Sequence, residues 1–326
     1  MQTRRTALNY LAFLGLTPLG AMATNADTYP DKMIRLVNPY AAGSSVDIVG
    51  RMIGERLTSV WKQPVVVESR TGAGGTVGAS VVTRAPADGY TLFVSVSTPL
   101  TVAPWVFKRL PYDPVKDLVP VFGITSGGLS LVVRKDFPAK NLKEFVAYLK
   151  ANPGQVRYGT AGIASPQHLS GELFQSKTGT KMIHVPYQGA VPAMTDMIGG
   201  HVDVMFDAVQ HVLPHVRAGK INGLAMLRAQ RSPVLPDLPT AREQGIEGVE
   251  TPGSVSIYAP GNTPPAILAK LESTIMATMN HEPTKRRLLE MGMTNQFVSG
   301  KEMGELLKLE RELYRQVVSA AKIEPQ

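Results

Sequence analysis

Short apolar runs alternate with amphipathic segments in the first hundred residues, and loops of small residues separate them. Residues 32–40 (KMIRLVNPY) predict a strand that ends at a proline. The apolar residues that follow are three and four positions apart, as in a helix with one buried face: Val46, Val49, Ile53, Leu57 and Val60. The next segments predict a strand, a glycine loop with a helix, and a strand: 64–69, 72–85 and 89–97. This order predicts a parallel α/β sheet with right-handed crossovers.

The same alternation starts again near residue 129. The second set predicts strands over four segments: 129–136, 156–162, 181–187 and 202–208. Helices are predicted between them, over 141–154, 165–179 and 191–200. Two further helices are predicted in the C-terminal part, over 264–280 and 300–322, and the second carries Met303, Leu307, Val317 and Ala321 on roughly one face. The chain is therefore expected to form two α/β lobes of similar organisation.

Composition narrows the class of protein. The chain has 326 residues, of which 44% are hydrophobic and 18% charged, a balance typical of globular proteins with about two domains. The net charge is +8, but no basic run is interleaved with aromatic residues, which argues against nucleic-acid binding. A mildly positive field favours small anionic partners.

The first residues predict an export signal. Arg4 and Arg5 precede an apolar stretch that is too short and too often broken by Gly and Pro to span a membrane. The small residues AMA at 21–23 predict cleavage after Ala23, with Ala26 as the alternative, so residues 1–23 are assigned to a signal peptide. The arginine pair leaves the general and twin-arginine export routes open. The chain has no cysteine, which excludes disulfides, thiolate metal sites and a lipid-anchored cysteine.

Three small-residue loops follow predicted strands, where ligands bind in open parallel sheets. The first is AGSS at 42–45, directly before a helix whose N-terminal amides suit a carboxylate or phosphate. Ser44 and Asp47 also fit a capping box, which would only start the helix. The second loop is GAGG at 72–75; it lacks the third small residue of a dinucleotide fingerprint because Val77 stands there, so a tight turn or a carboxylate-facing loop is expected. The third, GTAG at 159–162, leads to Ser165 as the cap of a helix and repeats the organisation of the first. Anion-suited loops in two lobes predict one shared cleft.

Other site types find little support. The sequence contains no P-loop, HExxH or GxSxG motif. His211 and His215 are four residues apart, but Pro214 lies between them and no carboxylate cluster accompanies them, so surface or packing roles are favoured over metal binding. His168 could act as a general base or as a hydrogen-bond donor, and no nucleophile is placed for it. Asp207 either makes a strand-end hydrogen bond or meets a ligand ammonium group or a water in the cleft.

A series of motifs in register resembles a known family. The segments are PYAAGSSVDIVGR, VVVESRTGAGGTVGA, DGYTL, YGTAGIASPQHLSGELF, HVPYQGAVPAMTDMIGGHVDVMFD, AGKINGLAM, RSPVLPDLPTAREQG and APGNTPPAILAKL. Their order is similar to that in the substrate-binding receptors of tripartite tricarboxylate transporters, the Bug-type periplasmic solute-binding proteins. The resemblance covers essentially the whole chain after the signal peptide.

The resemblance implies a type II periplasmic-binding-protein fold, with two α/β lobes joined by two crossing strands and a ligand cleft between them. Residues 27–124 and 249–326 would form lobe one, and residues 125–248 lobe two. It also implies an exported, non-enzymatic receptor, expected to be a monomer without metal or cofactor, that binds a di- or tricarboxylate, aromatic carboxylate or amino acid and delivers it to membrane permease subunits. A periplasmic input subunit for a sensor kinase and an enzyme on the same fold remain the alternatives.

Family members hold carboxylates through backbone amides of the first and third loops and through ordered waters. Carried over by motif, the expected ligand-binding residues are Tyr40, Gly43, Ser44, Asp47, Gly74, Gly75, Ser97, Thr160, Ala161, Ser165, His168, Tyr187 and Asp207. The sequence departs from the family pattern at Ser44, Val46 and Ile163, where Gly, Thr and Asn are usual. The apolar Ile163 predicts a ligand with a hydrophobic or aromatic body.

Overall fold

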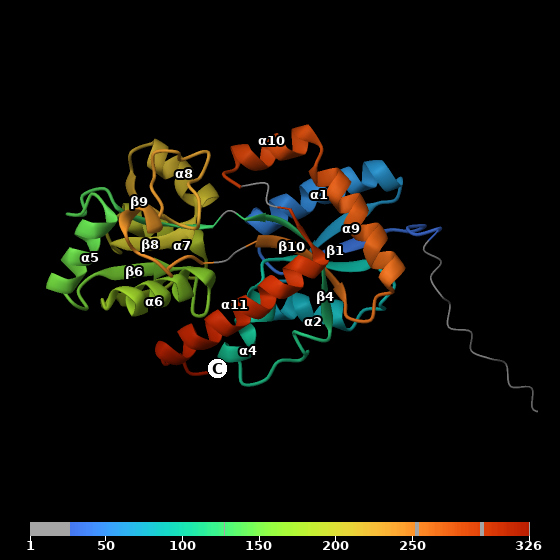
Figure 1. Ribbon diagram of the computed structural model, residues 1–326, viewed down its shortest axis with the longest axis horizontal. Helices are drawn as coiled ribbons and strands as arrows, with labels where there is room; N and C mark the ends of the chain where they lie inside the picture. Colours follow the sequence, from blue (N-terminus) through green and yellow to red (C-terminus); the bar gives the residue numbers. More distant parts are fainter. Residues whose placement is uncertain (1–26, 127, 252–253, 294–296, 326) are drawn as a thin grey trace, which may run out of the picture.

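Two α/β lobes lie side by side, each built on its own sheet (Figure 1). The computed structural model describes residues 27–126, 128–251, 254–293 and 297–325. The predicted signal peptide, with Arg4, Arg5 and Ala23, lies outside these ranges. No helix in the described ranges is long and apolar enough to cross a membrane.

Lobe one contains a six-stranded sheet. Its strands are β1 (Ile34–Asn38), β2 (Val65–Ser69), β3 (Thr91–Ser95), β4 (Leu118–Ser126), β10 (Ser254–Pro260) and β11 (Val298–Ser299), in the order β11-β4-β10-β3-β1-β2. The predicted parallel pairing is confirmed for β1 with β2 and for β1 with β3. By contrast β10 runs antiparallel to β3 and β4, and β11 antiparallel to β4, so the sheet is mixed.

Helices cover both faces of this sheet. They are α1 (Ser45–Trp61), α2 (Thr76–Thr83), α3 (Thr98–Thr101), α4 (Ala103–Val106), α9 (Pro265–Met279), α10 (Glu282–Glu290) and α11 (Gly300–Ala320), with a 3-10 turn at Ala73–Gly75. The predicted apolar face of α1 packs with α9 on one side, where Ile53 and Leu271 are fully buried. Helices α2 and α11 pack on the other side, where Val82 and Met303 are fully buried.

Lobe two contains a five-stranded sheet. Its strands are β5 (Leu129–Arg134), β6 (Arg157–Thr160), β7 (Ile183–Pro186), β8 (Val204–Ala208) and β9 (Ile221–Leu227), in the order β7-β6-β8-β5-β9. Its helices are α5 (Leu142–Ala151), α6 (Pro166–Thr178), α7 (Ala190–Ile198) and α8 (Val209–Arg217), with a 3-10 turn at Arg242–Gln244. Phe145 of α5 and Phe174 of α6 pack on one face, and Met197 of α7 and Val212 of α8 pack on the other.

The chain crosses between the lobes at two places. β4 belongs to the first sheet and is followed directly by β5 of the second. On the return, Val249 still packs in the core of lobe two, and β10 then pairs in lobe one. Because β5 enters its sheet from the other lobe rather than through a crossover helix, it runs antiparallel to β8 and β9, whereas β6 is parallel to β7 and β8. The predicted boundary after residue 124 falls inside β4, and Val249, which the sequence assigned to lobe one, packs in lobe two, so the exact boundaries stay a prediction.

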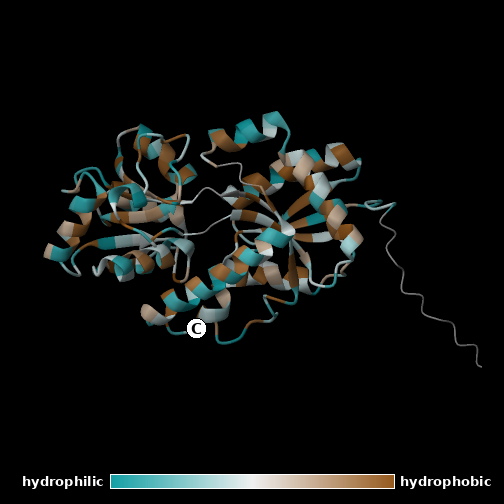
Figure 2. Cartoon of the chain, viewed as in Figure 1, coloured by the Kyte–Doolittle hydropathy of each residue, from teal (hydrophilic) through white to brown (hydrophobic). Residues whose placement is uncertain are grey.

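The last helix connects the two lobes through packing. The first half of α11 covers the sheet of lobe one, and its buried residues lie three, four or seven positions apart, as in an amphipathic helix. Near its C-terminal end, Tyr314 and Val317 pack with Val106 of α4 and with Leu173 of α6 in lobe two. Figure 2 shows hydrophobic strands inside both lobes and alternating hydrophilic and hydrophobic segments along α11.

Candidate functional site

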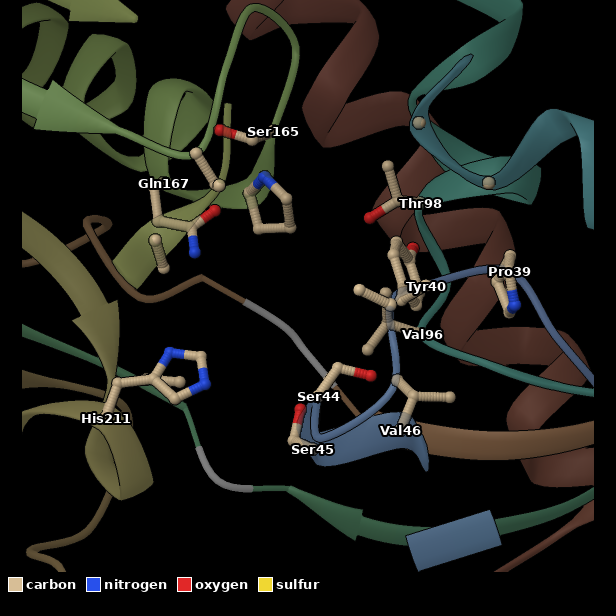
Figure 3. A pocket seen from close by; sticks show the side chains of 18 of the residues that line it. Pro39, Tyr40, Ser44, Ser45, Val46, Val96, Thr98, Ser165, Gln167 and His211 are labelled. Carbon is tan, nitrogen blue, oxygen red and sulfur yellow. The ribbon is translucent and has the colours of Figure 1, made fainter. Parts of the chain in front are cut away.

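A cavity of about 730 Å³ lies between the lobes (Figure 3). In both lobes it is bordered by loops that follow a strand and lead into a helix. This volume is in the range of small-molecule sites. Most of the lining residues come from the three predicted loops and the residues next to them, from the turn after β3, and from the starts of α6, α7 and α8. The described lining residues include no Lys, Arg, Asp or Glu. Any charged ligand is therefore met by backbone dipoles, hydroxyl and amide groups, and one histidine, His211.

The first loop presents the start of α1 to the cavity. Ser44 caps the helix, and its hydroxyl accepts a hydrogen bond from the amide of Asp47 at 3.2 Å. The amides of Ser45 and Val46 have no acceptor among the described residues, because the first amides of a helix lie beyond the reach of intrahelical carbonyls. Gly43 adopts φ +82°, a conformation that glycine reaches without strain. The loop thus offers unpaired donors and the positive end of the helix dipole to the cavity.

Asp47 lies behind this loop rather than in the cavity wall. Its carboxylate accepts hydrogen bonds from the Gly43 amide at 3.0 Å and from Arg51 Nε at 3.0 and 3.1 Å, and it is 3% exposed. Burial raises its pKa, but the hydrogen bonds from Arg51 and Gly43 outweigh burial and hold the pKa below its usual range. Ser44 caps the helix as the sequence predicts, but the reciprocal half of the capping box is absent, because Asp47 accepts the amide of Gly43 rather than that of Ser44.

The second loop and the turn after β3 complete the wall of lobe one. Gly74 and Gly75 have φ of +63° and +98° and both line the cavity. A Cβ at Gly75 would lie 2.9 Å from the Pro99 side chain, so only glycine fits there. Tyr40 lines the cavity with its ring while its hydroxyl is buried, which raises its pKa to about 12. Ser97 is buried in the same wall, and Glu310 of α11 lies behind it.

The third loop uses most of its own amides. The amide of Gly162 donates to Thr160 Oγ1 at 3.2 Å, and that of Ala164 donates to His168 Nδ1 at 3.1 Å. Ser165 caps α6 by accepting from the amide of His168 at 3.3 Å, and Pro166, the first residue of the helix, has no N–H. Ala161 and Ser165 face the cavity. The third loop resembles the first in design, yet it presents fewer free donors.

His168 supports this loop from behind. Its ring stacks on that of His184 with centroids 3.9 Å apart, and His184 Nε2 lies 2.7 Å from Thr160 Oγ1. Burial lowers the pKa of His168 to about 3, with a further contribution from His184, and burial lowers the pKa of His184 to about 4. Both rings are therefore neutral at physiological pH, as a ring that accepts the Ala164 amide must be.

Tyr187 and Asp207 also lie behind the cavity wall. The Tyr187 hydroxyl donates to Asp196 at 2.7 Å, and burial with this contact raises its pKa to about 12. Asp207 is fully buried at the end of β8 and accepts hydrogen bonds from the amide of Ala208 at 2.8 Å and from Gln167 Nε2 at 3.1 Å. The expected strand-end hydrogen bond of Asp207 is therefore present.

The expected residues thus divide into two groups. Those that line the cavity are Tyr40, Gly43, Ser44, Gly74, Gly75, Ser97, Ala161 and Ser165. Those that support the wall from behind are Asp47, Thr160, His168, Tyr187 and Asp207. Direct contact between any of them and a ligand stays a prediction.

The sequence favoured a surface or packing role for His211 over metal binding, and it did not place this residue at the cavity. His211 lines the cavity from α8, and its Nδ1 lies 3.2 Å from Asp207 Oδ1. No local spacing rule predicts this contact, because Asp207 belongs to β8 and His211 to the helix that follows it. Gln167 and Ile163 also line the cavity, and Ile163 is 53% exposed.

Comparison with known proteins agrees with this architecture. The sequence model of the family described as tripartite tricarboxylate transporter family receptor matches residues 49–320 of this chain. The chain belongs to this family. Protein BugT of Bordetella pertussis is 34% identical over 275 residues, which cover 84% of each chain, so the Bug-type resemblance is confirmed.

Two solved structures of the same type hold carboxylates. Rpa4515 of R. palustris with adipate is 32% identical, has a TM-score of 0.83, and is matched over 91% of this chain and 100% of its own. MatC of Rhodopseudomonas palustris with bound malate is 31% identical, has a TM-score of 0.79, and is matched over 89% of this chain and 100% of its own. The two-lobed α/β fold predicted from the sequence is confirmed by these likenesses.

Proposed function

We propose that this receptor works in the periplasm, binds a small carboxylate between its lobes, and delivers it to the permease subunits of a tripartite tricarboxylate transporter. The observation that carries the proposal is the start of α1, whose Ser45 and Val46 amides lack acceptors and border the cavity. Adipate and malate in the related structures support a carboxylate as the ligand class.

The chemistry of the wall fits this role better than a reaction. Hydrogen bonds between backbone amides and a carboxylate contribute about 1.5–3 kcal/mol each, which allows firm but reversible binding. The apolar Ile163 and Val191, 53% and 75% exposed, border the same cavity and suit the hydrocarbon part of a ligand. The described lining residues include no carboxylate or lysine, and His211 is the one side chain among them whose ordinary pKa suits acid–base chemistry near neutral pH.

A thermal-shift screen against di- and tricarboxylates, aromatic carboxylates and amino acids tests ligand capture. A ligand present at 100 times its Kd stabilises the folded state by about 2.7 kcal/mol. No shift with any carboxylate, at concentrations up to several millimolar, would contradict the proposal. Co-purification of the loaded receptor with permease subunits rather than with a sensor kinase tests delivery.

The free amide of Ser45 offers a sharper test. Ser45 is the first residue of α1, where proline is well tolerated, and Ser44 before it is extended. We expect Ser45→Pro to remove one N–H donor and to weaken carboxylate binding roughly tenfold or more. Calorimetric titration with the best ligand of the screen measures the effect.

Ser45→Ala is the matched control, because it removes the hydroxyl and keeps the amide. Both variants should keep the wild-type urea midpoint within the error of measurement. Equal affinities for Ser45→Pro and Ser45→Ala would show that the amide does not take part in binding.

A further inference from the structure

His211 differs from every other described residue that lines the cavity. It is the single lining side chain whose ordinary pKa lies near neutrality, and its neighbours in the wall are neutral. Figure 3 shows its ring projecting from the start of α8 into the space opposite Ser44 and Ser45 of lobe one. Its side chain is 33% exposed, so a ligand in the cavity can reach it.

Asp207 fixes the orientation and the protonated nitrogen of this ring. Its carboxylate can only accept hydrogen bonds, so the proton between the two residues belongs to His211 Nδ1, 3.2 Å from Asp207 Oδ1. Nε2 is then the nitrogen that remains for the cavity. Asp207 itself cannot turn away, because Gln167 and the Ala208 amide donate to the same oxygen.

The environment of His211 favours its charged form. The hydrogen bond and the negative charge of Asp207 raise the pKa of His211 above its ordinary value, and burial offsets part of this effect. Among the described residues, Asp207 is the one charged group that shifts the pKa of His211. The other polar side chains that line the cavity on α6, on α8 and in the first loop are uncharged: Gln167, Gln210, Ser44 and Ser45. The charge of His211 thus depends on its contact with Asp207.

We propose that His211 is a specificity-determining residue whose imidazolium Nε2–H binds a second anionic group of the ligand, and that Asp207 is its positioning residue. The inference rests on the proposed function and extends it. One carboxylate lies at the amides of the first loop, and the second lies at His211 in lobe two. The receptor therefore selects dicarboxylates over monocarboxylates of the same length.

The test uses pairs of ligands that differ by one carboxylate. Calorimetric titrations of the full mature chain compare succinate with butyrate, glutarate with pentanoate, and adipate with hexanoate. We expect at least one dicarboxylate to bind roughly tenfold or more tightly than its partner, as one charge-assisted hydrogen bond predicts. His211→Gln should abolish most of this preference, because glutamine keeps the hydrogen bond to Asp207 without the charge.

His215→Gln is the matched control. It lies one turn further along α8 and does not line the cavity, so the preference should be unchanged. Equal binding of both members of each pair by the wild-type chain, or an unchanged preference in His211→Gln, would overturn this inference alone. Failure of all mono- and dicarboxylates to bind would overturn the proposed function as well.

The pH dependence gives a second, independent measurement. Dicarboxylate affinity should fall as the pH rises through the pKa of His211, whereas monocarboxylate affinity should stay constant. Asp207→Asn should move the fall to lower pH, because it removes the charge that stabilises the imidazolium. Dicarboxylate affinity that instead rises with pH would show that the charged ring does not bind the second carboxylate, and would overturn the proposal.

Discussion

The first loop in lobe one and the third loop in lobe two have similar backbones at the cavity wall. They differ in the buried side chains that support them. In lobe one the supporting groups are carboxylates, Asp47 behind the first loop and Glu310 behind Ser97. In lobe two the third loop is supported by neutral histidines, His168 and His184. In each lobe a buried side chain accepts a hydrogen bond from one amide of the loop. Asp47 accepts from the Gly43 amide, and His168 accepts from the Ala164 amide.

The buried groups behind the two walls differ in how they respond to pH. A neutral histidine in a buried stack resists protonation, so lobe two is weakened by acid. The buried Glu310 resists ionisation, so the wall of lobe one is weakened by base. Asp47 has the opposite sign to Glu310: Arg51 and Gly43 stabilise its charged form, so its support of the first loop is lost in acid. Acid therefore tests the supports of the first and third loops, Asp47 and His168, whereas base tests Glu310 behind Ser97.

The largest effect is expected for lobe two in acid. The pKa of His168 is about 3 in the folded protein and about 6.5 in the unfolded chain, so its contribution to stability is present above pH 6.5 and is lost as the pH falls toward 3. The full loss is on the order of 5 kcal/mol. His168→Asn keeps an acceptor for the Ala164 amide and removes the titration. Its free energy of unfolding, from urea denaturation between pH 7 and 4, should fall less steeply than that of the wild type.

Two outcomes bear on this prediction. His184 also titrates, so the variant should keep part of the slope. Parallel curves for the wild type and His168→Asn would show that the buried ring is not the acid-sensitive support of this lobe.

A smaller effect of opposite sign is expected for Glu310. Burial raises its pKa to about 7 from 4.5, although a hydrogen bond with Ser97 partly counteracts this. Its contribution is therefore present below pH 4.5 and is lost as the pH rises through 7, an effect of about 3 kcal/mol. Glu310→Gln should gain stability relative to the wild type between pH 5 and 8, measured by urea denaturation.

The matched control is Glu312→Gln on the same helix. Glu312 is exposed and pairs with Arg315, so this variant should show no relative gain over that pH range. If Glu310→Gln and Glu312→Gln follow the same pH dependence, the buried carboxyl is not a source of strain behind the cavity.

How far the sequence predicts this molecule depends on how local each feature is. Helix α1 and its cap are fixed by neighbouring residues, so the spacing of Val49 and Ile53 and the pair Ser44 and Asp47 are sufficient. β4 pairs only with distant strands, β10 and β11, and contains Pro120 and Gly123, so no local pattern indicates it.

Dependence on distant residues also explains what the sequence did not show at the site. His211 faces the cavity only because α8 lies opposite the first loop, which depends on how the lobes pack. The second half of α11 packs on α6 of the other lobe. The spacing of its apolar residues by three and four predicts a buried face but does not indicate which element covers that face. The loops themselves were located because glycine and serine before a helix carry their own local signal.

The smallest effects on stability are expected from substitutions that change the backbone freedom of the first and third loops. Gly43 and Ala164 both have positive φ, of +82° and +60°, but only the first is a glycine. Gly43→Ala should destabilise the protein by about 1 kcal/mol, entirely through the backbone, because no atom lies within 4 Å of the added Cβ. Ala164→Gly should relieve the corresponding strain and stabilise the protein by about 0.5 kcal/mol, since the flexibility of glycine in the unfolded chain cancels part of the gain.

Gly154→Ala separates stability from binding in this comparison. Gly154 has φ +68°, open space around its Cα and no place in the cavity wall, so its substitution should cost about the same stability as Gly43→Ala and leave ligand affinity unchanged. Gly43→Ala should in addition weaken binding, because the strained loop shifts the Ser45 amide that the ligand needs. If both glycine variants bind equally well, the first loop tolerates movement, and the donors that hold the carboxylate lie elsewhere in the cavity.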